Sequence, residues 1–304
     1  MIKEYKLTIA VITMNRSVQL VEALDSCLAC TLPEKTEFVI LDNASTDDTL
    51  QVLAQYKQAH PETVLNYHHS DENLGVGGGR SFVFDRAAGE YVYFLDDDAI
   101  IAPECHSTFF ADSLAYLDAH PQVASMTTQI RDEILGFERM SFIQQEYRID
   151  EMPLMYFYLG GSHFLRKECF DVPLYFPIQY GSEEYLPSIK AIDKGFFHVY
   201  NENLSIIHKP KVNKWVDGTA RKRKVLICGA AVVYATKKLL YPAVFHPILW
   251  AGYQRRCNMY LKEYPGAKKE ADAMVRQIIR ENPCKKVRVS TVIRLFQTFG
   301  MTVF

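Results

Sequence analysis

Short apolar runs of strand character alternate with helical runs along the first hundred residues, and this alternation constrains the fold more than any other feature. The runs of strand character are residues 6–14, 36–43, 63–70 and 90–95. Residues 17–28 place apolar side chains at helical spacing after the first run, and residues 46–60 do so after the second. The pattern predicts an α/β fold, a Rossmann-like and mostly parallel sheet flanked by helices.

Capping residues, glycines and prolines predict further elements. Ser45 is a suitable N-cap for the second helix, with Asp47 and Asp48 in its first turn. Residues 73–80 read as a glycine-rich turn before a short helix, and Pro103 as the first residue of another helix. The later segments are a strand at 122–130, an irregular aromatic stretch at 131–180, a helix within 182–196, and closing strands at 197–200 and 204–209.

The positions that follow the predicted strands are mostly polar, small or acidic. They are Thr13 to Arg16, Asp42 to Ser45, Asn73 to Arg80 and Asp96 to Asp98. Open α/β sheets bind ligands outside the carboxyl ends of their strands. These positions are therefore the candidate binding residues.

The segment EYVYFLDDD, residues 90–98, leads an apolar strand directly into three aspartates. Asp96 and Asp98 are two residues apart, so both carboxylates can face one site and hold a hard cation such as Mg²⁺ or Mn²⁺. A 2+ ion would neutralise the repulsion between them. The alternative is a solvated acidic turn, which rarely follows so apolar a strand.

Two other strand ends suit parts of a nucleotide. The glycines of NLGVGGGR allow close approach of the backbone, and Arg80 after them suits a diphosphate, although a flexible turn explains the segment equally well. The segment fits neither GxGxxG nor a P-loop. Asp42 can accept hydrogen bonds from a base or a ribose, or it can cap a turn.

Taken together, the motifs identify a family resemblance. They are VITMNR (11–16), LDNASTDDT (41–49), ENLGVGGGR (72–80), AAGEYVYFLDDD (87–98), GGSHFLRKECFD (160–171), SEEYLPSIKAIDKGF (182–196) and SIIHK (205–209). In order and spacing the chain resembles the inverting glycosyltransferases of family 2, which have the GT-A fold, and among them bacterial rhamnosyltransferase-like members. The resemblance covers about residues 5–210.

The resemblance implies roles for individual residues. It assigns Asp98 as the main ligand of Mn²⁺ or Mg²⁺, with Asp96 toward the ribose or the metal and His208 completing the metal or diphosphate site. The residues that it implies for binding the nucleotide sugar are Thr13, Asn15, Arg16, Asp42, Asn43, Asn73, Gly75, Gly79, Arg80, Asp96, Asp97, Gly161 and Ser162.

The catalytic base in the family is an acidic residue of an ED pair, often continued as ED-x-D-L. This chain has Glu183 and Glu184 at the pair and Leu186 at the later acidic position. This departure leaves the base open between two glutamates, of which the register favours Glu184. The alternative is that both are solvated acids that stabilise a helix N-terminus.

The function that the resemblance implies is metal-dependent transfer of a hexosyl or deoxyhexosyl group from a UDP- or dTDP-sugar to a glycan or lipid-linked acceptor, in cell-surface polysaccharide synthesis. Alternatives are a protein or peptide glycosyltransferase and a non-catalytic sugar-nucleotide-binding protein. A nucleotidyltransferase is disfavoured, because TMNRSVQ stands where such enzymes have a glycine-rich loop. No nucleic-acid partner is expected.

The first two thirds of the chain are acidic and the last third is basic. Residues 1–204 hold 14 Lys and Arg against 31 Asp and Glu, whereas residues 205–304 hold 20 against 5. We expect a catalytic domain at 1–210 and a helical, basic extension at 211–304 that serves membrane association, acceptor binding or homo-oligomerisation.

The apolar stretch 225–253 is interrupted by Lys237, Lys238 and two prolines, so no spanning helix is expected. It would either lie in a membrane interface or pack on the catalytic domain. Without a signal-peptide core at the start, a cytoplasmic location is expected, with peripheral association at the inner membrane face as an option. Cys27 and Cys30 form one CxxC, for which helix packing is favoured over a redox or zinc role.

Overall fold

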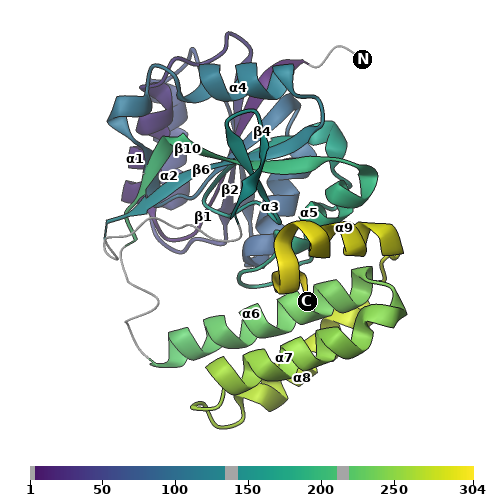
Figure 1. The fold of residues 1–304 in the computed structure, drawn as a ribbon. Helices are drawn as coiled ribbons and strands as arrows, with labels where there is room; N and C mark the ends of the chain where they lie inside the picture. Colours follow the sequence, from purple (N-terminus) through teal and green to yellow (C-terminus); the bar gives the residue numbers. More distant parts are fainter. Residues whose placement is uncertain (1–3, 134–142, 211–218) are drawn as a thin grey trace.

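The computed structural model describes residues 4–133, 143–210 and 219–304, and its centre is one mixed β-sheet (Figure 1). The strand order is β3-β2-β1-β4-β9-β6-β10-β8-β7, with β5 paired to β10. The strands are β1 (Tyr5–Thr13), β2 (Thr36–Asn43), β3 (Val64–Ser70), β4 (Gly89–Leu95), β5 (Ala99–Ile101), β6 (Val123–Asp132), β7 (Ile143–Ile149), β8 (Met152–Met155), β9 (Ser162–Arg166) and β10 (Phe197–His208).

Helices cover both faces of this sheet, as the alternating sequence predicts. They are α1 (Ser17–Leu28), α2 (Thr49–Ala59), α3 (Gly75–Arg86), α4 (Phe109–Ala119) and α5 (Tyr185–Lys194). Leu7 and Ile9 of β1 point to the core beneath α1, α2 and α4, while Ala10, the residue after Ile9, points to the core beneath α3 and α5. Alternation with a period of two thus places each strand between two apolar layers. The predicted α/β class and mostly parallel central sheet are confirmed, since β3, β2, β1 and β4 all run parallel.

The stretch 131–180, predicted to be irregular, instead contributes three antiparallel strands. β9 lies between β4 and β6 and runs antiparallel to both, and β8 and β7 extend the far edge beyond β10. Part of this stretch, residues 134–142, lies outside the described residues. The two predicted closing strands form one continuous strand, β10, whose pairing with β6 shifts between Asn201 and Ser205.

Two predicted helix starts are wrong. Ser45 does not cap α2, because its hydroxyl accepts from the Asn15 main chain, and Asp47 instead accepts from the N–H of Thr49 at the helix start. The glycine-rich segment is helical rather than a turn. A Cβ at Gly77 would lie 2.0 Å from the main-chain oxygen of Phe176, so glycine lets α3 pack directly on that neighbouring segment.

The predicted helix at Pro103 is divided as well. It consists of a single 3-10 turn, Pro103–Cys105, followed by α4, which begins at Phe109.

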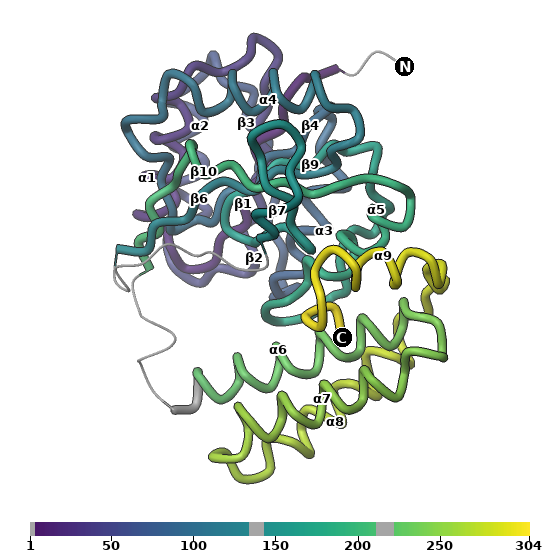
Figure 2. Tube along the Cα trace, in the orientation of Figure 1, coloured from purple at the N-terminus to yellow at the C-terminus, as the bar shows by residue number. Residues whose placement is uncertain are grey.

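The last part of the chain forms a separate helical layer beside α5 (Figures 1 and 2). It consists of α6 (Thr219–Leu240), α7 (His246–Tyr260), α8 (Ala267–Glu281), α9 (Val289–Phe299) and short 3-10 turns at Ala243–Phe245 and Gly300–Val303. Its apolar side chains form one core with Tyr156 and Tyr185 of the sheet domain. None of the described helices has the length and apolar character needed to cross a bilayer. The boundary expected between residues 210 and 211 adjoins residues 211–218, which lie outside the described part.

Candidate active site

The acidic loop Asp96–Asp98 and the pair Glu183–Glu184 lie together at the carboxyl edge of the sheet, although 85 or more residues separate them in the chain. The acidic loop follows β4, and the glutamates directly precede α5. The N–H of Asp96 donates to the main-chain oxygen of Gly161 at 3.0 Å, which fixes the loop against the start of β9. The fold therefore brings the five carboxyl groups of the acidic loop and the glutamate pair to one region.

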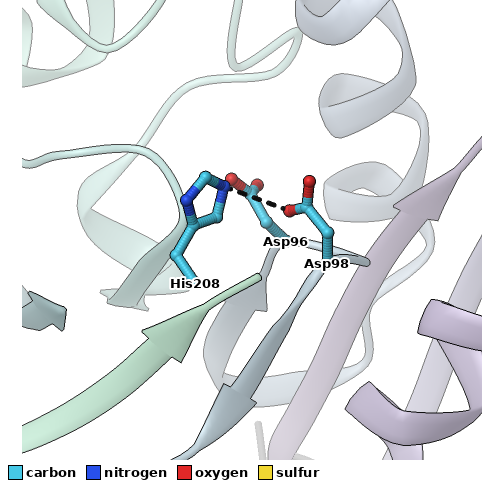
Figure 3. Close-up of side chains that lie close together, drawn as sticks. All are labelled: Asp96, Asp98 and His208. Atoms are coloured by element: carbon cyan, nitrogen blue, oxygen red, sulfur yellow. Dashed lines mark ion pairs between the residues drawn. The ribbon is translucent and has the colours of Figure 1, made fainter. Parts of the chain in front are cut away.

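Three side chains form a candidate cation site (Figure 3). Asp96, Asp98 and His208 each offer a ligand atom, and these atoms lie within 4.8 Å of one another. His208 stands at the end of β10, with Nε2 3.3 Å from Asp98 Oδ1. Its Nδ1 lies 2.8 Å from Asp132 Oδ2 at the end of β6. A carboxylate behind a histidine fixes its tautomer and orients the other nitrogen, as is usual for metal-binding histidines.

Arg80 connects the acidic loop to the two glutamates. Its Nη2 donates to Asp96 Oδ1 at 2.7 Å, and its Nη1 lies 2.6 Å from Glu183 Oε1 and 3.5 Å from Glu184 Oε1. Only 5% of Arg80 is exposed. Burial acts to lower the pKa of Arg80, but the three carboxylates together raise it above its ordinary value. The guanidinium is therefore a fixed positive charge at the centre of the site.

Glu183 and Glu184 differ in their surroundings. Glu183 is almost completely buried, with Oε2 lacking a hydrogen-bond partner among the described residues, whereas Glu184 is somewhat more accessible. Burial and the adjacent Glu183 carboxylate raise the pKa of Glu184 to about 8, although Arg80 opposes the rise. A Cβ at Gly160 would lie 2.4 Å from Glu184 Oε1. Glycine there gives the Glu184 carboxylate its space.

A second arginine contacts the other side of the acidic loop. Arg16 Nη1 donates to Asp97 Oδ1 at 2.7 Å and also to Asp98 Oδ2. Burial raises the pKa of Asp97 to about 6, despite the opposing charge of Arg16. Arg16 and Arg80 thus flank the three aspartates from two sides.

The predicted nucleoside residues lie at the ends of β1 and β2, where Thr13 is paired in register with Asp42. Asp42 is fully buried; one of its oxygens accepts from the Ser45 N–H and the other lies 2.8 Å from Nδ1 of His69. Asn15 uses its side-chain oxygen to accept from the main chain of residues 46 and 47. Asn15 therefore holds the adjacent loop in place.

The remaining candidates lie around this region with different orientations. Asn43 and Asn73 hydrogen-bond to each other, and Asn73 also accepts from the N–H of Gly75. Gly79 faces Ile12 and Leu41 in the core.

Around the start of β9, a Cβ on Gly161 would lie 3.2 Å from Asp96 Oδ2. The hydroxyl of Ser162 hydrogen-bonds to the hydroxyls of Tyr93 and Thr128 within the sheet.

Two polar residues of the site were missed in the sequence. Asp132 and His69 stand at or near the ends of β6 and β3 and contact predicted site residues. Both occupy the kind of strand-end position that singled out Asp42 and Asp96. The rule of polar strand ends would have found both if it had been applied to every strand.

The chain matches the model of one protein family over residues 8–171, and that family is described as Glycosyl transferase family 2. The matched segment includes the acidic loop, Arg80 and Asp42. It ends before the glutamate pair and His208.

Curated relatives match over shorter segments. A processive diacylglycerol beta-glycosyltransferase of Mycoplasma pneumoniae is 34% identical over 68 residues, which cover 22% of this chain and 20% of the relative. A poly(ribitol-phosphate) beta-glucosyltransferase of Bacillus spizizenii is 34% identical over 100 residues, which cover 33% of this chain and 16% of the relative. The matched segments thus span one fifth or less of the length of these relatives.

Solved structures match over nearly the whole chain. TarS 1–349 of S. aureus in complex with UDP-GlcNAc has a TM-score of 0.65 and 17% identity, covering 98% of this chain and 89% of that one. Mannosyltransferase PcManGT of Pyrobaculum calidifontis in complex with GDP-Man and Mn²⁺ has a TM-score of 0.58 and 18% identity, covering 98% and 81%. At these identities the likeness concerns the fold.

Proposed function

The chain belongs to glycosyl transferase family 2, and we propose that it moves a hexosyl or deoxyhexosyl group from a nucleoside-diphosphate sugar to a hydroxyl of a glycan or lipid-linked acceptor, with inversion at the anomeric carbon. The observation that carries the proposal is the Arg80 bridge between Asp96 and the two glutamates. Direct displacement needs a group that takes the acceptor proton close to a group that stabilises the leaving diphosphate. The bridge joins candidates for both.

The donor set of the candidate cation site fits Mn²⁺ or Mg²⁺. Asp98, Asp96 and His208 would hold the ion, and the hydrogen bond from His208 to Asp132 supports this assignment. Bound there, the ion would supply positive charge against the diphosphate that leaves.

Glu184 is the proposed base. A group with a pKa of about 8 accepts a proton efficiently near neutral pH, and Glu184 is the more accessible of the two glutamates. Its carboxylate would take the proton of the acceptor hydroxyl while that oxygen bonds to the anomeric carbon. Arg80 would hold the carboxylate in position and lie near the diphosphate or the sugar.

Asp42 and Asn43 would bind the nucleoside, with the other strand-end residues around them. The expected donor carries uridine or thymidine diphosphate, and the Asp42 carboxylate would accept a hydrogen bond from the imide N–H of such a base. A thermal-shift ranking of UDP-, dTDP- and GDP-sugars with Mn²⁺ at equal concentration tests this, since a donor that binds more tightly stabilises the folded state more.

The base assignment is tested with Glu184→Gln and Glu183→Gln, and with Glu62→Gln on the surface as a matched control. Release of nucleoside diphosphate and transfer to acceptor are measured together with donor binding. Glu184→Gln is expected to lower kcat by about 10²–10⁴-fold with donor affinity unchanged. Normal turnover of this variant alongside an inactive Glu183→Gln would move the role to Glu183. Metal-dependent binding without turnover of any donor would instead favour a non-catalytic binding protein.

The acceptor is proposed to belong to cell-surface polysaccharide synthesis. Two of the similar proteins carry diacylglycerol and poly(ribitol-phosphate) in their names, which are a lipid and a polymer. Such acceptors suit an enzyme on the cytoplasmic side of the membrane, with peripheral contact at its inner face.

A further inference from the structure

One side of α9 is apolar and uncovered. Val289, Ile293 and Phe296 are 46%, 46% and 43% exposed. At positions i, i+4 and i+7 they fall within an arc of about 60° around the helix axis. A different side of α9 is buried through Thr291, Val292 and Leu295. The exposed stripe is therefore additional to the side by which α9 packs on the protein.

The stripe continues onto neighbouring segments. The N–H of Val287, just before α9, donates to the main-chain oxygen of Leu240 at 2.8 Å, which places the start of α9 beside the end of α6. There the 3-10 turn Ala243–Phe245 exposes Val244 (70%), and Met301 after α9 is 60% exposed.

Phe304 joins these segments, with ring centroids 5.9 Å from Phe245 and 5.8 Å from Phe296. Val244, Val289, Ile293, Phe296 and Met301 are called the C-terminal patch below.

Positive charge surrounds the C-terminal patch. Residues 282–304 contain four Lys and Arg and no Asp or Glu. Arg288 pairs with Asp193 and Arg294 donates to the main chain of α5. Lys285 and Lys286 are exposed, and within the described residues neither forms an ion pair with a carboxylate; Lys286 donates instead to the main-chain oxygen of Lys238. Exposed apolar side chains edged by unpaired lysines match the chemistry of an anionic lipid surface.

We infer that the C-terminal patch binds the surface of an anionic bilayer, with the apolar side chains of α9 in the interface and Lys285 and Lys286 on lipid headgroups. This surface shares only Val244 with the stretch 225–253 considered in the sequence, because the apolar residues of α6, such as Ile227 and Ala231, are buried in the helical core. Membrane contact is thus assigned to the end of the helical layer.

The helix α5 connects the C-terminal patch to the candidate active site. Arg288 and Thr291 of the α9 segment both contact Asp193 near the end of α5. Asp193 is nine residues from Glu184, or about 14 Å along the helix. If the proposed function is correct, α5 connects the membrane-binding α9 segment to Glu184, the carboxylate that would take the proton of a lipid-linked acceptor.

The test measures co-sedimentation of the full chain with vesicles of phosphatidylcholine, with and without phosphatidylglycerol. No sugar donor is present, so the result is independent of transfer activity. Two double variants probe the patch, Ile293→Asp with Phe296→Asp, and Lys285→Gln with Lys286→Gln. Val64→Asp with Val172→Asp is the matched control, because these valines are 40% and 56% exposed elsewhere on the surface. Thermal melts check that each variant is folded.

The native chain and the control are expected to bind anionic vesicles well and neutral vesicles weakly. The lysine variant should lose about 30-fold in affinity for anionic vesicles, since each cation near the surface contributes about fivefold. The aspartate variant should lose tenfold or more. Equal binding to both vesicle types, or unchanged binding of both patch variants, would overturn the inference. So would loss of a dimer in light scattering of the aspartate variant without loss of vesicle binding, which would assign the patch to contact between copies.

Discussion

Replacing Arg80 with methionine removes the charge that links three carboxylates while keeping an unbranched apolar stem. Arg80 is buried and lies 2.6–3.5 Å from oxygens of Glu183, Glu184 and Asp96. Removing one partner of a buried ion pair costs about 3–5 kcal/mol, because the other charge stays behind without compensation. For a chain of this size that corresponds to a loss of about 5–8 °C in Tm.

The pH dependence separates charge from packing. Glu184 already has its pKa raised to about 8, so the unfolded chain releases this proton before the folded chain does, and stability falls as pH rises from about 4.5 to 8. Without Arg80 the pKa rises further, so the fall in stability continues to higher pH. The loss of Tm in Arg80→Met should therefore be larger at pH 9.5 than at pH 5.

Differential scanning calorimetry at both pH values measures this, with Arg16→Met as a control whose side chain is 27% exposed and whose loss should be smaller. An equal loss at pH 5 and pH 9.5 would show that Arg80 acts by packing and not by charge.

Three further predictions concern single groups. The pH profile of kcat/KM should fall on the acid side with an apparent pKa near 8 if Glu184 is the base; an acid limb confined below pH 5 would contradict this. Asp132→Asn should weaken Mn²⁺ binding about 10–100-fold, measured by titration calorimetry, because it removes the carboxylate behind His208; unchanged affinity would exclude that supporting role. Burial and Arg256 lower the pKa of Lys237 to about 7, so the unfolded chain holds a proton that the folded chain has lost, and stability should rise from pH 7 toward 10. In Lys237→Met this rise in Tm should be smaller than in the native chain, and an identical rise would refute the assignment.

The local parts of the fold could be predicted because their signals are local. The strands β1 to β4 and the helix α1 are encoded by periodicity within 6 to 12 residues, and the polar strand ends placed Asp42 and Asp96 at one edge. The insertion of β9 between β4 and β6 could not be predicted. Strand order depends on contacts between distant segments, and the apolar run around Phe164 gives no indication of its neighbours.

In the candidate site, too, individual residues could be predicted from the sequence but their contacts could not. The sequence predicted that Arg80 and the glutamates matter, but not that they touch, since they are 103 and 104 residues apart. The orientation of Ser162 was also out of reach. A strand residue can face either side of the sheet, and Ser162 faces the side on which it hydrogen-bonds to the hydroxyls of Tyr93 and Thr128.

The balance of charge around Arg16 and Arg80 has a consequence for the order of binding. Five carboxyl groups share two guanidinium groups, and with Glu184 protonated the other four carboxylates still exceed the two arginines by two. A nucleotide arriving alone would bring further negative charge to a site that is already rich in it, whereas a nucleotide arriving with a divalent ion adds almost no net charge. Arg16 and Arg80 can then form ion pairs with the phosphate groups in place of the carboxylates. Nucleotide affinity should accordingly be conditional on the cation, and cation affinity on the nucleotide, by the same factor.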